Sequence, residues 1–208
     1  MTHLPVLRKG REYRSLNTYN MPHVETGEPV ATVSQANRGL IARDMADADA
    51  NKHALERLSV REIMDMCGRA SRAFMEETLP LGDDTQSPDQ YVKQLSSTTG
   101  MPEALCRANM AKICLVLDEM EAVLGGLTRG LNLDILDAGW GEQDGRKLSY
   151  VATSNALGAV LPSNSPGVHS LWLPALPLRV PLVLKPGSGE PWTPFRIAQA
   201  FMSVGAPG

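Results

Sequence analysis

The chain has 208 residues, and its 20 basic and 23 acidic side chains give a formal net charge of −3. This length suffices for one hydrophobic core with at most a small appendage. A mildly acidic chain without a run of like charges is a poor partner for nucleic acid. No apolar stretch reaches the roughly 18 residues that a membrane-spanning helix needs, so we expect no membrane contact.

The N-terminal residues and the cysteines indicate in which cellular compartment the protein is expected. Residues 1–9 lack the apolar core of a signal peptide. Cys67, Cys106 and Cys114 are therefore predicted to be reduced thiols in a cytoplasmic protein. All three fall on apolar helical faces, which indicates packing rather than chemistry. No spacing of histidine, cysteine and aspartate resembles a zinc site, and we predict no metal.

Residues 1–33 are predicted to form an extended N-terminal segment, because they show no helical periodicity. Within it, 26–29 is typical of a turn and 30–33 of a short strand. Residues 34–138 are predicted to be the helical part of a cofactor-binding domain. Its first helix follows Ser34, and the apolar residues of that helix share one face: Leu40, Ile41 and Met45.

Two serines mark further helix starts. Ser59 and Glu62 have the spacing of a capping box, and Ser87 with Gln90 repeats it. The predicted ends of these two helices are Pro80–Gly82 and Gly100. The apolar stripe of the first is Ile63, Met66, Cys67, Ala70 and Phe74. A still longer helix is predicted from Pro102 to Gly125–Gly126, with the stripe Cys106, Met110, Ile113, Cys114, Leu117, Met120 and Leu124.

The pattern changes after about residue 138. Residues 139–155 are predicted to contain a turn-rich loop at 140–146, with Glu142 and Asp144 solvated, and an exposed strand at 147–153. Residues 156–208 are predicted to begin a parallel sheet. Their short apolar runs, 156–161 and 180–184, are typical of strands covered on both faces. Residues 168–179 can be helical, with Pro174 and Pro177 expected to kink or tighten the helix, and Pro191 opens a last helix. The expected fold class is therefore α/β, with a βαβ unit after the helical part.

Polar residues follow both predicted strands of that unit, in Pro162–Pro166 and Leu184–Ser188. Asn164 could donate its side-chain amide to an oxyanion, and Lys185 could reach a ribose hydroxyl or a phosphate. The residues equally allow Asn164 to cap the next helix and Lys185 to be merely solvated. Neither G-x-G-x-x-G nor a phosphate-binding Walker loop is present. His169, one turn further, is interpreted as a packed or helix-surface histidine.

The same stretch resembles the aldehyde dehydrogenase superfamily. The resemblance lies in Pro162-Ser163-Asn164-Ser165-Pro166, which is similar to P-W-N-x-P, and in Leu184-Lys185-Pro186-Gly187-Ser188, which is similar to L-K-P-S-E. Upstream, Glu25–Val33 is similar to the T-G-E segment of that family. The resemblance covers nearly all of 20–208 and is specific in the last fifty residues.

The resemblance implies an N-terminal part of an NAD(P)-dependent oxidoreductase that acts on an aldehyde or an acyl-CoA through a cysteine thioester. It implies that Asn164 is the oxyanion-hole amide and Lys185 the cofactor contact. The cofactor groove would be lined by Leu161, Pro162, Ser163, Asn164, Lys185, Pro186, Gly187 and Ser188. It further implies that 147–153, together with the strand at 156, is a hairpin arm that pairs subunits of a homo-oligomer.

Two departures from the family pattern matter. Ser163 stands where the family has tryptophan, and Ser188 aligns with its ribose-binding glutamate, so Glu190 falls two positions late. These departures leave open whether the cofactor is NAD or NADP, and they favour the acyl-CoA reductase branch of the superfamily. The family's nucleophilic cysteine, general-base glutamate and G-x-T-x-x-G loop would lie beyond the matched region, so we expect an incomplete domain with open sheet edges and a tendency to associate. The alternative is a non-catalytic nucleotide-binding or interaction fragment.

Overall fold

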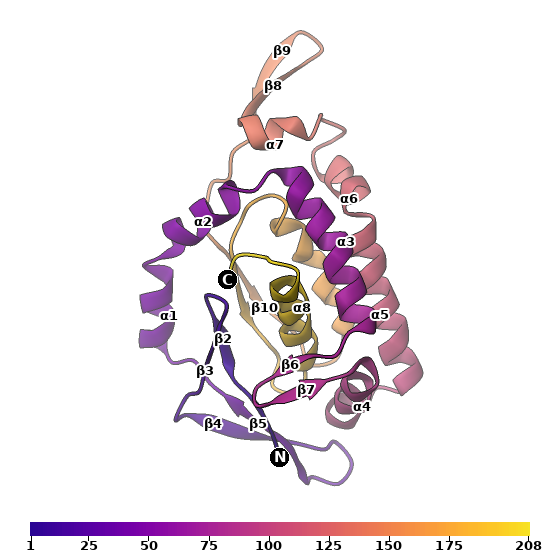
Figure 1. Ribbon diagram of the computed structural model, residues 1–208. Coiled ribbons are helices and arrows are strands. Elements are labelled where there is room, and N and C mark those ends of the chain that lie inside the picture. Colours follow the sequence, from indigo (N-terminus) through magenta and orange to yellow (C-terminus); the bar gives the residue numbers. More distant parts are fainter.

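The N-terminal segment forms strands in the computed structural model, which describes residues 1–208 (Figure 1). The predicted turn and strand are confirmed, because Gly27 has a φ of +73° and β5 follows it at Pro29–Ser34. β5 pairs in parallel with β1 and antiparallel with β4. Four further strands of this segment were not predicted, because runs of three to five residues are too short to show clear alternation: β1 (Thr2–Leu4), β2 (Val6–Arg8), β3 (Arg11–Tyr13) and β4 (Thr18–Pro22).

Helices follow this sheet, as predicted, but in more pieces. They are α1 (Arg38–Met45), α2 (Ala48–Glu56), α3 (Val60–Glu76) and α4 (Pro88–Thr99). Both capping boxes are confirmed: the hydroxyls of Ser59 and Ser87 accept the N–H of the residue three positions on, and their own backbone N–H groups donate to the side chain of that residue. Gly100 ends α4 in the left-handed conformation, as predicted. α1 contains no buried residue, so its apolar face is not covered within this chain.

Two of the predicted helix boundaries are wrong. α3 ends at Glu76, and the residues expected to stop it form a hairpin of β6 (Leu79–Leu81) and β7 (Asp84–Gln86). The long helix after Pro102 breaks at Glu119 into α5 (Glu103–Asp118) and α6 (Met120–Leu127), and the two glycines lie inside α6. Its whole predicted stripe is nevertheless buried, because both pieces keep their apolar faces on the core.

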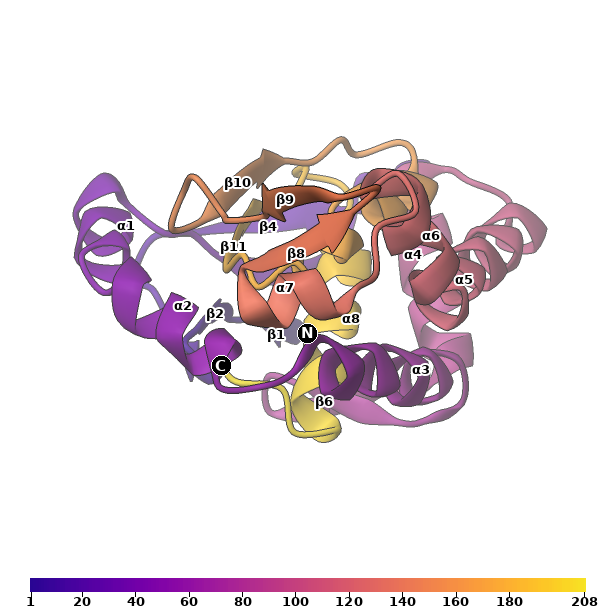
Figure 2. The ribbon, with the colours of Figure 1, turned by 90° about the horizontal axis from the view of Figure 1, so that it is seen from above.

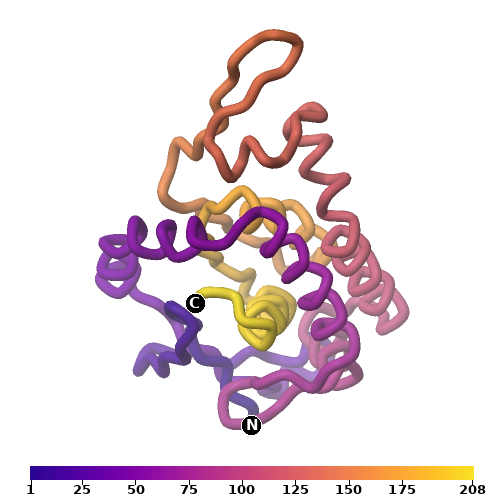
Figure 3. The backbone as a smooth tube through the Cα atoms, turned by 45° about the horizontal axis from the view of Figure 1, so that its top comes forward, coloured from indigo at the N-terminus to yellow at the C-terminus, as the bar shows by residue number.

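A hairpin replaces the loop predicted at 140–146. After the short α7 (Asp134–Ala138), β8 (Trp140–Gln143) pairs with β9 (Arg146–Ser149) through a turn at Asp144-Gly145, both with positive φ. β9 is thus paired with the segment before it, and not with the strand at 156. The hairpin projects beyond the rest of the molecule in Figures 1 and 3, and Trp140 is 61% exposed.

The last part contains the predicted parallel pair. β10 (Leu157–Val160) pairs in parallel with β11 (Leu182–Lys185), and α8 (Trp192–Ser203) follows Pro191. The helical segment predicted at 168–179 is confirmed only in its tightened form. The crossover consists of the 3₁₀ turns η1 (Pro166–Leu171) and η2 (Leu173–Ala175) and contains no α-helix, because prolines interrupt regular helix. The expected burial on both faces is wrong, since Val160 is 78% exposed.

α8 lies at the centre of the hydrophobic core and packs on α3, α4 and β6. Figure 2 shows α8 inside the molecule, with α1 on one side and α4–α6 on the other. Arg196 of α8 is buried and donates to the carbonyls of Phe74, Glu77 and Gln86. Burial lowers the pKa of this guanidinium to about 10. The three bonds of Arg196 hold α8 against the end of α3 and against β7. No helix is long and apolar enough to cross a membrane.

Candidate functional site

Two polar loops leave the same edge of the β10–β11 sheet. The register pairs Val160 with Lys185, and the Leu161 N–H donates to the Lys185 carbonyl at 2.9 Å. The segments that follow, 161–165 and 186–189, therefore start side by side. In open α/β sheets ligands bind at this carboxyl edge of parallel strands.

The two loops also touch each other. The Gly189 N–H donates to Ser163 Oγ at 3.1 Å. A Cβ added to Gly187 would lie 2.7 Å from the backbone N of Ser163 and from the carbonyl C of Pro162. Only glycine allows this approach. Ser163 is thus a structural link between the two loops.

Asn164 and Lys185 are both exposed at this edge. The N-cap of η1 is Ser165, without a side-chain capping bond, so the alternative in which Asn164 caps the next helix is wrong. Lys185 takes part in none of the ion pairs of the chain. Both side chains are free to bind a ligand.

The other predicted groove residues differ in how far they are exposed at this edge. Leu161 is buried in the core, so only its backbone can face a ligand. Pro162 and Ser188 are exposed, and Pro186 is half-buried. The carbonyl of Ser188 accepts a bond from the Tyr19 hydroxyl at 2.9 Å. That bond anchors the second loop to β4 and leaves the Ser188 side chain outside.

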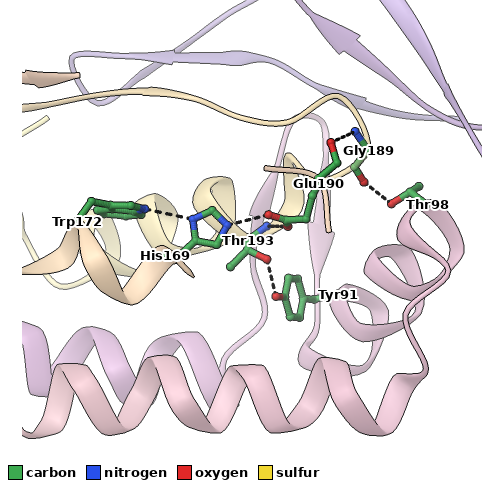
Figure 4. Close-up of polar contacts among 8 residues, drawn as sticks. Tyr91, Thr98, His169, Trp172, Gly189, Glu190 and Thr193 are labelled. Carbon is green, nitrogen blue, oxygen red and sulfur yellow. Dashed lines mark hydrogen bonds and ion pairs between the residues drawn. The ribbon is translucent and has the colours of Figure 1, made fainter. Parts of the chain in front are cut away.

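A buried hydrogen-bonded chain lies beneath the second loop, and sequence reasoning missed it (Figure 4). Glu190 and His169 are both 0% exposed. Glu190 Oε2 contacts His169 Nε2 at 2.7 Å, and Glu190 Oε1 accepts the Thr193 N–H at 2.8 Å. The Trp172 indole N–H donates to His169 Nδ1 at 3.1 Å. These hydrogen bonds join the turn at 187–190 to the crossover between β10 and β11.

The direction of these bonds follows from the indole. Trp172 Nε1 can only donate, so His169 Nδ1 carries no proton and Nε2–H donates to Glu190. The prediction that His169 is packed is confirmed. The i, i+3 spacing of His169 and Trp172, and a glutamate just before a Pro-Trp helix start, were the available signals.

The three cysteines are unsuited to nucleophilic work. All are buried, and burial raises the pKa of each thiol, that of Cys67 to about 12. A thiolate is the reactive species, so a raised pKa keeps a cysteine inert at neutral pH. Their predicted role as packing groups is confirmed.

An open hollow of about 1030 Å³ lies elsewhere, between α2, α6, α7, segment 150–157 and the crossover. Its lining is mainly apolar and includes none of the predicted site residues. The chemistry-bearing residues therefore lie at the sheet edge and not in this hollow.

This edge belongs to an open α/β fold in which ligands bind at strand ends, and solved structures with the same fold include aldehyde dehydrogenases. A putative aldehyde dehydrogenase from Burkholderia cenocepacia matches 100% of this chain and 40% of its own, with 16% identity and a TM-score of 0.77. A putative methylmalonate-semialdehyde dehydrogenase from Sinorhizobium meliloti, complexed with NAD, matches 100% and 40%, with 17% identity and a TM-score of 0.75. An E. coli NADP dependent enzyme matches 100% and 40%, with 14% identity and a TM-score of 0.72.

The chain thus has the fold of part of an aldehyde dehydrogenase, as the resemblance predicted. It spans about 40% of the length of the structures it matches, so this α/β domain is incomplete relative to theirs. No family model matches the sequence, and no curated protein does.

Proposed function

We propose that the chain is the N-terminal part of an NAD(P)-dependent oxidoreductase that acts on an aldehyde or an acyl-CoA through a cysteine thioester. The observation that carries this proposal is the pair of exposed, unpartnered side chains, Asn164 and Lys185, at neighbouring strand ends. The shared fold adds support, because the similar structures include one named with NAD and one named as NADP dependent.

The residues at the edge fit a dinucleotide. Lys185 supplies a free cation for a phosphate or a ribose hydroxyl. The turn after it is closed by a bridge between Gly187 and Glu190, and the exposed Ser188 hydroxyl adds a polar group. When bound, the nicotinamide supplies or accepts hydride. In this proposal 185–188 hold the adenosine side and 161–164 border the dinucleotide.

Asn164 has the chemistry of an oxyanion donor. Its side-chain N–H groups are exposed and unused, so they can stabilise the charge that develops when a thiolate attacks a carbonyl. The thiolate would come from outside residues 1–208, because the three cysteines here are buried. For an aldehyde, the attack would give a thiohemiacetal, and a thioester would follow only when its hydride is lost to the oxidised dinucleotide. That thioester would be hydrolysed or passed to coenzyme A, and the departures at Ser163 and Ser188 favour the acyl-CoA branch.

The exposed hairpin of β8 and β9 supports a further part of the proposal. It projects from the body and exposes Trp140, as expected of an arm that pairs with a second subunit (Figure 1). We propose a homo-oligomer located in the cytoplasm.

The catalytic part is tested by Asn164→Ala in the complete enzyme. Loss of one oxyanion donor should lower kcat by about 10²–10³-fold. Asn17→Ala is the matched control, because it changes an exposed asparagine that lies far from Asn164 in the sequence. It should leave kcat unchanged. Turnover of Asn164→Ala within a factor of about three of the parent would refute the role.

A non-catalytic nucleotide-binding fragment is the other class to be separated. It would bind NAD or NADP at the same edge, yet no aldehyde or acyl-CoA would be turned over by the complete protein. Turnover by the complete protein that also depends on Asn164 would exclude it.

A further inference from the structure

The Asn164 side chain is exposed and makes no hydrogen bond that would hold it in place. An amide stabilises an oxyanion well only if it is already held where the charge develops, because moving it there during the reaction costs free energy. The position of Asn164 therefore has to be set by the backbone on either side of it.

Two contacts fix that backbone. Before Asn164, Ser163 Oγ accepts the Gly189 N–H at 3.1 Å. After it, His169 lies in η1 and donates from Nε2 to Glu190 at 2.7 Å. Gly189 and Glu190 are consecutive, so Asn164 lies between two residues that are bonded to the same turn.

The turn is itself fixed to the core (Figure 4). Thr98 Oγ1 of α4 donates to the Gly189 carbonyl at 2.8 Å and accepts the Trp192 indole N–H at 3.0 Å. The other oxygen of Glu190 accepts the Thr193 N–H at the start of α8. Thr98, Glu190 and Trp192 are all buried, so water does not compete for these bonds. Contacts that end on this turn therefore end on a rigid support.

The His169 ring uses both of its nitrogens, and it is 0% exposed. While Nε2–H donates to Glu190, Nδ1 accepts the Trp172 indole N–H, which would lose its acceptor if the ring turned over. η1 also lies close against α5, because a Cβ added to Gly167 would meet Asn109 Oδ1 at 2.6 Å. The ring therefore links the position of η1 to that of the turn.

We infer that His169 is a positioning residue for the oxyanion donor: through Glu190 and η1 it sets where the Asn164 amide lies. The inference rests on the proposed function, because it concerns how Asn164 performs the role proposed above. His169 is fully buried and touches no ligand at the sheet edge. Its loss should therefore act on turnover only through Asn164.

The test is a double-mutant cycle in the complete enzyme, with kcat measured at saturating substrates. His169→Leu removes both ring bonds and should lower kcat about ten- to a hundredfold, because a displacement of about 1 Å can cost that much. In an Asn164→Ala background the same substitution should lower kcat by less than about twofold, because the side chain that it displaces is gone.

A matched pair of variants separates the two bonds of the ring. The amide of His169→Gln ends about as far from the backbone as Nε2, so it can still donate to Glu190, and kcat should stay within about fivefold of the parent. The amide of His169→Asn is shorter and can serve only Trp172. It should therefore lower kcat about as much as His169→Leu does.

Leu55→Ala controls for a loss of stability, because it removes a buried side chain from α2, which contributes no residue to either loop. Any change in kcat that it causes should be the same with and without Asn164. If His169→Leu does not fold, the comparison of His169→Gln with His169→Asn decides in its place.

The outcomes separate two failures. Equal factors for His169→Leu in the two backgrounds, an unchanged kcat, or equal kcat values for His169→Gln and His169→Asn would overturn the positioning role while the role of Asn164 stands. If Asn164→Ala itself left kcat unchanged, or if the complete protein turned over neither an aldehyde nor an acyl-CoA, the proposed function would fail and the positioning role with it.

Discussion

The Glu190 side chain lies on the buried side of the turn at 187–190 and not on its exposed side. The aligned position in the family pattern is Ser188, so the sequence alone leaves open whether a glutamate two positions later could still face the ligand. The tight turn at 187–190 decides this by placing Glu190 beneath the edge, against His169 and Thr193. The sequence predicted the strand ends that carry Asn164 and Lys185. It could not predict the bond between His169 and Glu190, because these residues are 21 positions apart.

Removing this carboxylate should destabilise the protein. Glu190→Ala leaves the His169 Nε2–H and the Thr193 N–H buried without acceptors, and should lower the free energy of unfolding by about 2–4 kcal/mol. Urea denaturation measures the change. Glu142→Ala, at an exposed glutamate of β8, should change it by less than about 0.5 kcal/mol. Equal small effects at both positions would show that the buried chain contributes little.

Among the helices and strands, sequence signals gave correct predictions where the residues involved lie within one helical turn of each other. The capping boxes at Ser59 and Ser87, and the stop at Gly100, formed as predicted. The break between α5 and α6 was not predictable, because the apolar stripe continues through Glu119. The strands β10 and β11 were found from their apolar runs, whereas the crossover between them became 3₁₀ turns under the influence of its prolines.

The contact between the two loops gives a sharp test at this scale. Gly187→Ala places a Cβ 2.7 Å from the backbone of Ser163 and Pro162, so one loop must move. Overpacking of this kind should lower the free energy of unfolding by about 1–3 kcal/mol and weaken dinucleotide binding. Thermal unfolding and calorimetric titration measure the two effects.

Gly158→Ala is the matched control. Gly158 lies in β10 of the same sheet, and a Cβ there meets no atom within 4 Å. It should change neither stability nor binding by a measurable amount. If Gly187→Ala behaved like this control, the close approach of the loops would be unimportant for the site.

On the scale of the whole molecule, the sheet is the least covered part. β10 and β11 form a two-stranded sheet, so each has an open edge, and Val160 and Leu157 are exposed. The apolar runs correctly predicted strands, but their burial depends on neighbours that residues 1–208 do not supply. The similar structures are about two and a half times longer, in keeping with a sheet that is complete only with more strands.

We propose that a dinucleotide binds where β10 and β11 end. The most direct measurement is a titration of the ¹⁵N-labelled chain with NADP⁺, followed by amide chemical shifts in two-dimensional NMR spectra. We expect saturable shifts concentrated in 161–164 and 185–189, and their loss in Lys185→Met. Shifts confined to the apolar hollow near 150–157, or no shifts at all, would contradict it.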